Sequence, residues 1–271
     1  MPPLARSGAD KSKRAGEPRR ACVNARKSAT GLTQKGETCE HGASYNPIGV
    51  TIARADRIFF YAYPPYGKLK MKLYDVEYSG NCYKVRLFAA LAGLPLALSP
   101  IDLRAGEQHT EAFAKLTPMR QVPVLVDVNV PIWDSQAILI YLARKHQLAH
   151  WWPDDAIQQA HVASWLSVAA NEIAAGFAAA RRAVKWSRPD NLDAARAICA
   201  KILPRLDDHV RTRHWFVTNH PTIADCALFP YIALAHEGSI DLQPFPHLRI
   251  WLNRVIGQPG FIPMSGLKDA Y

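Results

Sequence analysis

The order of hydrophobic patterns along the chain restricts its fold more than any other feature. Between residues 71 and 146, seven short segments follow one another. Strands are expected over 71–76, 96–103, 122–126 and 130–133, and helices over 82–92, 109–116 and 135–146. Beyond these, the pattern is wholly helical, over 157–186, 192–211, 222–236 and 247–256. The sequence therefore predicts an α/β domain of order β-α-β-α-β-β-α at 71–150, packed against an all-helical domain at 156–271.

The first seventy residues differ from the rest in composition. They hold 13 Lys or Arg against 5 Asp or Glu, and residues 1–57 show no sustained strand or helix period. Such a segment buries too little apolar surface to offset its ordering entropy, so we expect residues 1–70 to form a basic, disordered leader. On this interpretation Met71 is a natural start, and the leader is a disordered tail or an untranslated stretch. A transit peptide and a nucleic-acid-binding appendage are alternatives.

Charge and cysteine content argue against several classes of protein for residues 71–271. These residues carry 20 Lys or Arg against 18 Asp or Glu, so we expect no nucleic-acid-binding face. No stretch of eighteen or more residues is uniformly apolar, which argues against a membrane-spanning segment. The five cysteines stand at scattered spacings, without the Cys/His grouping typical of zinc. We expect free thiols in a reducing, cytoplasmic compartment, and no metal.

Two polar motifs border predicted strands. In the first, RQVPVL at 120–125, Pro123 enters a core strand, where its missing N–H need not pair. In the second, WDSQAI at 133–138, Asp134 and Ser135 stand where a helix begins. The free N–H groups and dipole of a helix start favour an anion, serine adds a donor, and a carboxylate favours an ammonium. The pair therefore suits a zwitterionic ligand, and an ordinary helix cap is the alternative.

The segment YSGNCYKVR at 78–86 joins the first predicted strand to the first helix. Ser79 offers a short hydroxyl donor there. Cys82 offers a rival sulfur in the first turn of the helix, where a thiolate would be favoured. A lone cysteine beside a core helix is also commonly a small buried hydrophobe. Tyr78 and Tyr83 are further candidates, with packing as their alternative role.

A third motif, PTIADCAL at 221–228, contains Thr222 and Asp225 at the spacing of a capping box. There each side chain can bond the other residue's backbone N–H. We expect a structural role for this pair and no catalytic one.

Together these motifs resemble the signature of the cytosolic glutathione transferase superfamily, in its bacterial form with a serine-class, theta- or zeta-like turn. The resemblance covers residues 71–271 and implies a thioredoxin-like fold for the first domain, with Pro123 in the cis form. It implies that glutathione is the co-substrate, bound by Gln121, Val122, Pro123, Asp134 and Ser135. Ser79 would be the catalytic hydroxyl that faces the sulfur, although many relatives carry proline where this chain has Gly80.

The resemblance also implies the reaction and the partners. Glutathione would be activated for attack on a small electrophilic molecule, by a homodimer. The acceptor pocket would lie between the first helix and the segment 157–186, where Trp165, Phe177 and Arg181 are candidates for its lining. The two aromatic residues have plain core packing as their alternative. Two other functions stay open: a glutathione-dependent thiol reductase that uses Cys82, and a non-catalytic protein with this fold that binds other proteins.

Overall fold

The computed structural model describes residues 53–54, 57–58, 71–268 and 270–271. The chain divides into two compact units, residues 1–62 and 63–271. In the first unit the described residues form two short antiparallel strands, β1 (Ala53–Arg54) and β2 (Arg57–Ile58). The sequence did not predict them, because two residues are too few to establish a period. The prediction of a disordered leader otherwise concerns residues outside the described ranges, and it stays a prediction.

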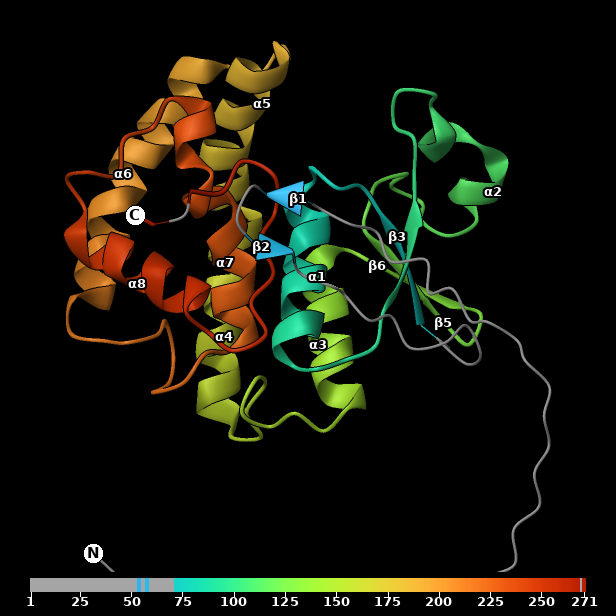
Figure 1. The fold of residues 1–271 in the computed structure, drawn as a ribbon, viewed down its shortest axis with the longest axis horizontal. Helices are drawn as coiled ribbons and strands as arrows, with labels where there is room; N and C mark the ends of the chain where they lie inside the picture. Colours follow the sequence, from blue (N-terminus) through green and yellow to red (C-terminus); the bar gives the residue numbers. More distant parts are fainter. Residues whose placement is uncertain (1–52, 55–56, 59–70, 269) are drawn as a thin grey trace, which may run out of the picture. The chain divides into compact units, whose positions relative to one another are not determined.

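The second unit begins with a four-stranded mixed sheet in the order β4-β3-β5-β6 (Figure 1). Its strands are β3 (Met71–Asp75), β4 (Ala97–Pro100), β5 (Val124–Asp127) and β6 (Val130–Trp133). The associated helices are α1 (Gly80–Leu91), η1 (Glu107–His109), α2 (Glu111–Ala114) and α3 (Ser135–Lys145). Because β3 runs parallel to β4 and antiparallel to β5, this is the thioredoxin-like arrangement that the resemblance implied.

The rest of the second unit is helical, as predicted. It consists of α4 (Ala156–Ala170), a π-helical turn η2 (Ala174–Ala178), α5 (Ala179–Trp186), α6 (Leu192–Arg211), α7 (Ile223–Ala233), η3 (Ala235–Gly238) and α8 (Pro246–Ile256). The helix predicted over 157–186 is thus interrupted by the π-helical turn.

That interrupted helix, Ala156–Trp186, is long and apolar enough, by length and composition alone, to cross a membrane. Part of it packs inside the protein instead: α4 lies against α7, and η2 lies against α6. Leu166, Ile173 and Phe177 on its inner side are buried in the core. Core packing therefore accounts for the apolar residues on the inner side of this segment.

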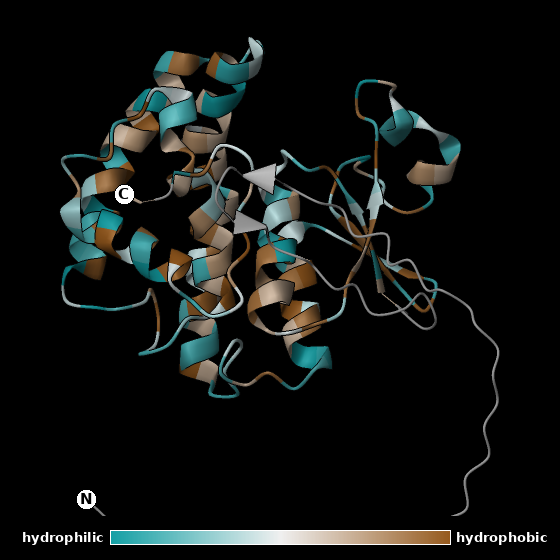
Figure 2. Ribbon diagram, viewed as in Figure 1, coloured by the Kyte–Doolittle hydropathy of each residue, from teal (hydrophilic) through white to brown (hydrophobic). Residues whose placement is uncertain are grey.

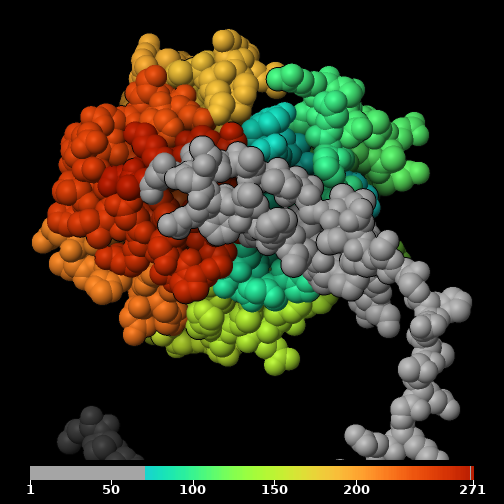
Figure 3. Space-filling view, in the orientation of Figure 1, coloured from blue at the N-terminus to red at the C-terminus, as the bar shows by residue number. Residues whose placement is uncertain are grey.

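The second unit has an α/β half, from β3 to α3, and a helical half, from α4 to α8. The two halves meet along α7, which packs against both α1 and α4. Ten of the eleven residues of α7 are buried, and hydrophobic ribbon is concentrated on α1, α3 and α7 (Figure 2). In the space-filling view the yellow-to-red helical half lies directly against the cyan and green α/β half (Figure 3). The position of α1 is consequently fixed by the helical half as well as by its own sheet.

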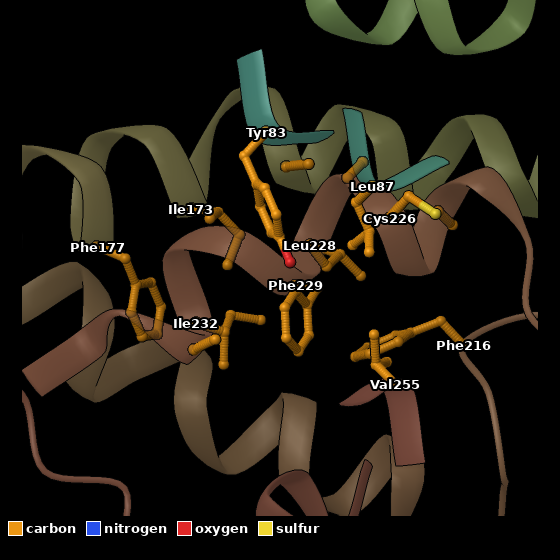
Figure 4. Close-up of a cluster of buried hydrophobic side chains, with 14 of the residues drawn as sticks. Tyr83, Leu87, Ile173, Phe177, Phe216, Cys226, Leu228, Phe229, Ile232 and Val255 are labelled. Atoms are coloured by element: carbon orange, nitrogen blue, oxygen red, sulfur yellow. The ribbon is translucent and has the colours of Figure 1, made fainter. Parts of the chain in front are cut away.

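Tyr83 lies inside this interface. Its side chain points from α1 toward Phe229 of α7, and its hydroxyl donates to the carbonyl oxygen of Ile262 at 2.5 Å (Figure 4). Of the two roles considered for Tyr83, the structure supports packing.

Candidate functional site

Three segments of the chain reach the same end of the sheet. β3 ends at Asp75, β5 begins at Val124 and β6 ends at Trp133. In the strand register Tyr74 lies opposite Val124, and Val124 lies opposite Trp133. The turn after β3, the loop before β5 and the helix start after β6 therefore meet at one edge of the sheet. All of the predicted site residues belong to these three segments.

Ser79 is the N-cap residue of α1 and is half-buried. Its Oγ accepts a hydrogen bond from the backbone N–H of Cys82 at 3.3 Å, and its own N–H donates to the carbonyl of Val76 at 3.0 Å. Accepting this bond does not use the hydroxyl hydrogen, which can be donated to the nearby sulfur of Cys82 or to a ligand. The helix start adds a local positive potential at this hydroxyl.

Cys82 lies beneath Ser79 and is fully buried. Burial, followed by the nearby Asp75 carboxylate, raises the pKa of its thiol to about 12. The expectation that the first turn of α1 would favour a thiolate at this cysteine is therefore wrong, because burial outweighs the helix dipole. Cys82 is a protonated core thiol at neutral pH.

The loop before β5 contains a cis peptide bond between Val122 and Pro123, as the resemblance implied. Pro123 is buried, Val122 is half-buried and Gln121 is exposed. The loop thus presents its polar residue to solvent while its proline anchors it in the core.

Asp134 and Ser135 begin α3 in different ways. Asp134 is exposed and caps the helix, with its Oδ1 accepting from the N–H groups of Gln136 at 2.9 Å and Ala137 at 3.1 Å. Its φ of 72° is unfavourable for a residue other than glycine, and such strain is typically found at functional sites. Ser135 is buried, and its hydroxyl donates to Oε1 of Gln136 at 2.5 Å. The capping alternative thus applies to Asp134 and leaves its strained backbone unexplained.

Two residues near this site were not identified from the sequence. Lys84 on α1 is fully buried, and burial lowers its pKa to about 8, with partial compensation from Asp134. Its ammonium lies 5.5 Å from the ring centre of Tyr231, which covers the first turn of α1. A Cβ at Gly80 would come within 2.7 Å of that ring, which explains the glycine. A lysine inside the apolar stretch of α1 was the available signal.

The three residues considered for the acceptor pocket divide into two groups. Phe177 is buried in the core (Figure 4), and the ring of Trp165 packs 4.6 Å from the ring of Phe216. Both aromatic residues are core, the alternative role considered for them. Arg181, in contrast, reaches the turn before α1 and donates to the carbonyl of Tyr78 at 2.9 Å. Among the described residues, no group of three or more His, Cys, Asp or Glu is placed to hold a metal ion.

A thioredoxin-like domain followed by an all-helical domain is the architecture that the resemblance to cytosolic glutathione transferases implied. Two family models match the chain: "Glutathione S-transferase, N-terminal domain" at residues 69–144 and "Glutathione S-transferase, C-terminal domain" at residues 168–259. The chain belongs to the glutathione S-transferase family.

Individual relatives agree with this assignment. The chain is 31% identical over 207 residues to glutathione S-transferase theta-3 of Mus musculus. This match covers 70% of this chain and 83% of the mouse protein. The crystal structure of a glutathione S-transferase from Pseudomonas fluorescens matches with a TM-score of 0.68 and 30% identity, over 72% of this chain and 99% of that one. A delta-class glutathione transferase of Nilaparvata lugens matches with a TM-score of 0.64 and 27% identity, over 70% and 90% of the two chains.

Proposed function

We propose that this enzyme binds glutathione at the sheet end formed by residues 121–123 and 134–135, and that Ser79 activates the thiol for attack on a small electrophile. The observation that carries the proposal is the half-buried Ser79 hydroxyl, which accepts a hydrogen bond at a helix start and still has a hydrogen to donate. Its hydrogen can therefore be donated to a sulfur at this position.

The chemical need for such a donor follows from thiol acidity. A thiol with a pKa near 8.5 is mostly protonated at neutral pH, and only the thiolate is a strong nucleophile. A hydroxyl hydrogen bond and the positive end of α1 both favour the anion. Lowering the pKa of the bound thiol by two units requires about 2.7 kcal/mol. The thiolate then forms a bond to the electrophilic carbon, and the leaving group departs with the electron pair.

The ends of glutathione fit the other two segments. Asp134 presents a carboxylate at the start of α3, which suits the ammonium of the γ-glutamyl group. The amides of Gln136 and Ala137 already donate to Asp134, so it is the positive end of the helix dipole that suits the carboxylate of the same group. The backbone of Val122, held beside cis-Pro123, would pair with the cysteinyl part of the peptide. The electrophile is then left to contact residues of the helical half.

Glutathione-agarose retention followed by assays with aryl halide, epoxide and disulfide substrates tests this function. We expect conjugation to electrophilic carbon, with a loss of roughly 10- to 1000-fold in Ser79→Ala and little change in Cys82→Ala. The opposite result, with activity lost in Cys82→Ala and kept in Ser79→Ala, would indicate a thiol reductase. Retention without any activity would favour a binding protein.

We propose further that the enzyme is a cytoplasmic homodimer. The edge strand β6 supports an interface, because Val130 is 60% exposed and Trp133 is 43% exposed. Sedimentation at micromolar concentration should give the mass of two chains, and a monomer alone would contradict the proposal.

A further inference from the structure

The three carbonyl groups that precede Ser79 are all hydrogen-bonded. The carbonyl of Val76 accepts from Ser79 N–H at 3.0 Å, within the turn itself. The carbonyl of Glu77 accepts from Nη2 of Arg86 on α1 at 2.7 Å. The carbonyl of Tyr78, which is bonded to the nitrogen of Ser79, accepts from Nη1 of Arg181 on α5 at 2.9 Å. Of these three bonds, only the last comes from the helical half of the enzyme.

Arg181 is itself held firmly. Its side chain is 2% exposed, and its Nε donates to a carboxylate oxygen of Glu237 in η3. The ring centre of Trp186 lies 4.6 Å from its guanidinium carbon. A guanidinium is planar and directs its N–H groups in fixed directions, so one side chain can bond Glu237 and Tyr78 at the same time. The carbonyl of Tyr78 is thereby linked to η3 through a rigid group.

The backbone around this link is tightly packed. A Cβ at Gly238 would lie 3.0 Å from the backbone nitrogen of Arg181, and a Cβ at Gly266 would lie 2.2 Å from Oε1 of Glu237. The π-helical turn η2 ends three residues before Arg181, and such turns are frequent at functional sites. η3 and α5 are therefore packed too closely for the link to shift freely.

Charge and hydrogen bonding around Arg181 are also unbalanced. Glu237 pairs with both Arg181 and Lys185, which leaves one net positive charge in this group of three. Nη2 of Arg181 is buried and has no hydrogen-bond partner among the described residues. Buried donors are usually hydrogen-bonded, so within the described part of the chain Nη2 is an exception, as is Nε of Arg86 on α1. The guanidinium of Arg181 is therefore a buried cation that bonds Tyr78, the residue directly before Ser79.

We propose that Arg181 is a positioning residue of the reaction: by holding the Tyr78 carbonyl from the helical half, it sets the place of the Ser79 hydroxyl opposite the glutathione sulfur. This inference rests on the proposed function of Ser79. It makes the helical half a part of thiol activation in addition to its role in binding the electrophile.

The test compares Arg181→Gln with Arg182→Gln in the full chain. Arg182 is the matched control, because it stands next on the same helix, is 44% exposed and pairs with Asp190. We expect Arg181→Gln to lower kcat by about 10- to 100-fold and to change the Kd for glutathione by less than about twofold. Because Arg181 acts through Ser79, the same change should add almost nothing in a Ser79→Ala background. Arg182→Gln should behave as the wild type in both backgrounds.

Amide hydrogen exchange of the segment 76–82 gives a second readout that needs no activity. We expect faster exchange at this turn in Arg181→Gln than in Arg182→Gln. Equal exchange, or a loss of kcat that is the same with and without Ser79, would overturn the inference. A wild-type chain that conjugates nothing would overturn the proposed function instead, and the exchange comparison would still decide about Arg181.

Should Arg181→Gln fail to fold, Arg181→Lys takes its place in the same measurements. It keeps the buried positive charge beside Glu237, but its single ammonium lacks the planar fork that bonds Glu237 and Tyr78 in their present positions. The same loss of kcat and the same faster exchange are expected. Wild-type values for both in Arg181→Lys would overturn the inference.

Discussion

The first turns of α1 and α7 are capped by the same kind of residue, but the two caps differ in how completely they are hydrogen-bonded. Each begins with a capping hydroxyl residue, Ser79 or Thr222. At α7 the third residue of the helix is Asp225, whose carboxylate accepts from the N–H of Thr222 at 2.9 Å and from Nε1 of Trp251 at 3.0 Å. At α1 the third residue is Cys82, which has no carboxylate to return the bond. One cap is reciprocal and closed, and the other is open on one side.

Burial separates the two caps as well. Thr222 and Asp225 are fully buried, whereas Ser79 is half-buried at the edge of the sheet. The carboxylate of Asp225 also accepts from the N–H of Phe216 at 3.2 Å, so it joins α7 to the preceding loop and to α8. A closed, buried cap therefore stabilises the fold, as predicted for Thr222 and Asp225. The cap at Ser79 lies at the edge of the sheet instead, and the carbonyls before it are held by Arg86 and Arg181.

The largest effect on stability is expected at the closed cap. Asp225→Ala would leave the N–H groups of Thr222, Phe216 and Trp251 buried without their acceptor, at a cost of about 3 to 5 kcal/mol in the free energy of unfolding. Urea unfolding measures this. The matched control is Asp241→Ala, since Asp241 is exposed and accepts from the nearby Gln243 N–H. Equal losses in the two variants would show that the closed cap contributes no more than a surface turn.

A somewhat smaller effect, of opposite sign, is expected beside the open cap. The folded pKa of Lys84, about 8, lies below its unfolded value, so the unfolded chain binds this proton more tightly. This difference lowers the free energy of unfolding. The loss is fully present below pH 8 and is relieved as the pH rises toward the ordinary pKa of lysine. Lys84→Met should therefore raise the free energy of unfolding by about 3 kcal/mol at neutral pH and remove this rise with pH.

Urea unfolding at neutral and alkaline pH tests the Lys84 prediction, with Lys201→Met on the exposed face of α6 as the control. A loss of stability in Lys84→Met would mean that the buried ammonium has a stabilising partner. The surroundings of the first turn of α1 would then balance its charges and hydrogen bonds as fully as those of the first turn of α7 do.

The start of α3 should show an intermediate effect on binding. Asp134→Ala and Ser135→Ala are each expected to weaken glutathione binding by about tenfold, as loss of a charge-assisted hydrogen bond would. Calorimetry measures the affinity, and cooperative unfolding should persist in both variants. Unchanged affinity in both would return this pair to a purely structural role, like that of Thr222 and Asp225.

The smallest effect is expected from removing residues 1–70. A chain that starts at Met71 should keep the thermal midpoint and the glutathione affinity of the full chain, because the leader has no core pattern. A chain that no longer folds would show that residues 58–66, which are rich in aromatic side chains, pack against the enzyme.

Local patterns allowed much of this structure to be predicted. The strand at 130–133 and the helix at 192–211 were predicted with the bounds observed, because turns or caps mark both of their ends. The strand expected over 96–103 stops at Pro100, because its partner β3 ends opposite it at Asp75. A strand's end depends on its neighbour, which its own sequence does not contain.

The site likewise combines features that local sequence marks with features that depend on distant parts of the chain. The cap at Asp134 has a local signal and was considered from the sequence, whereas cis-Pro123 was implied by the family resemblance. Ser79 was expected as a hydroxyl near a helix start, and the structure adds that it caps α1. The link from Arg181 to Tyr78 joins residues 103 positions apart. The burial of Lys84 likewise depends on α7 packing against α1, so neither feature could be predicted from a local pattern.

The central claim, that the open cap at Ser79 stabilises the thiolate of bound glutathione, is tested most directly by titrating that thiol. Ultraviolet absorbance of the thiolate in the complex, followed against pH, gives its pKa in the wild type and in Ser79→Ala. We predict a value about two units below the free thiol's 8.5 in the wild type, and a return to near 8.5 in Ser79→Ala. The same depressed pKa in both proteins would contradict the claim.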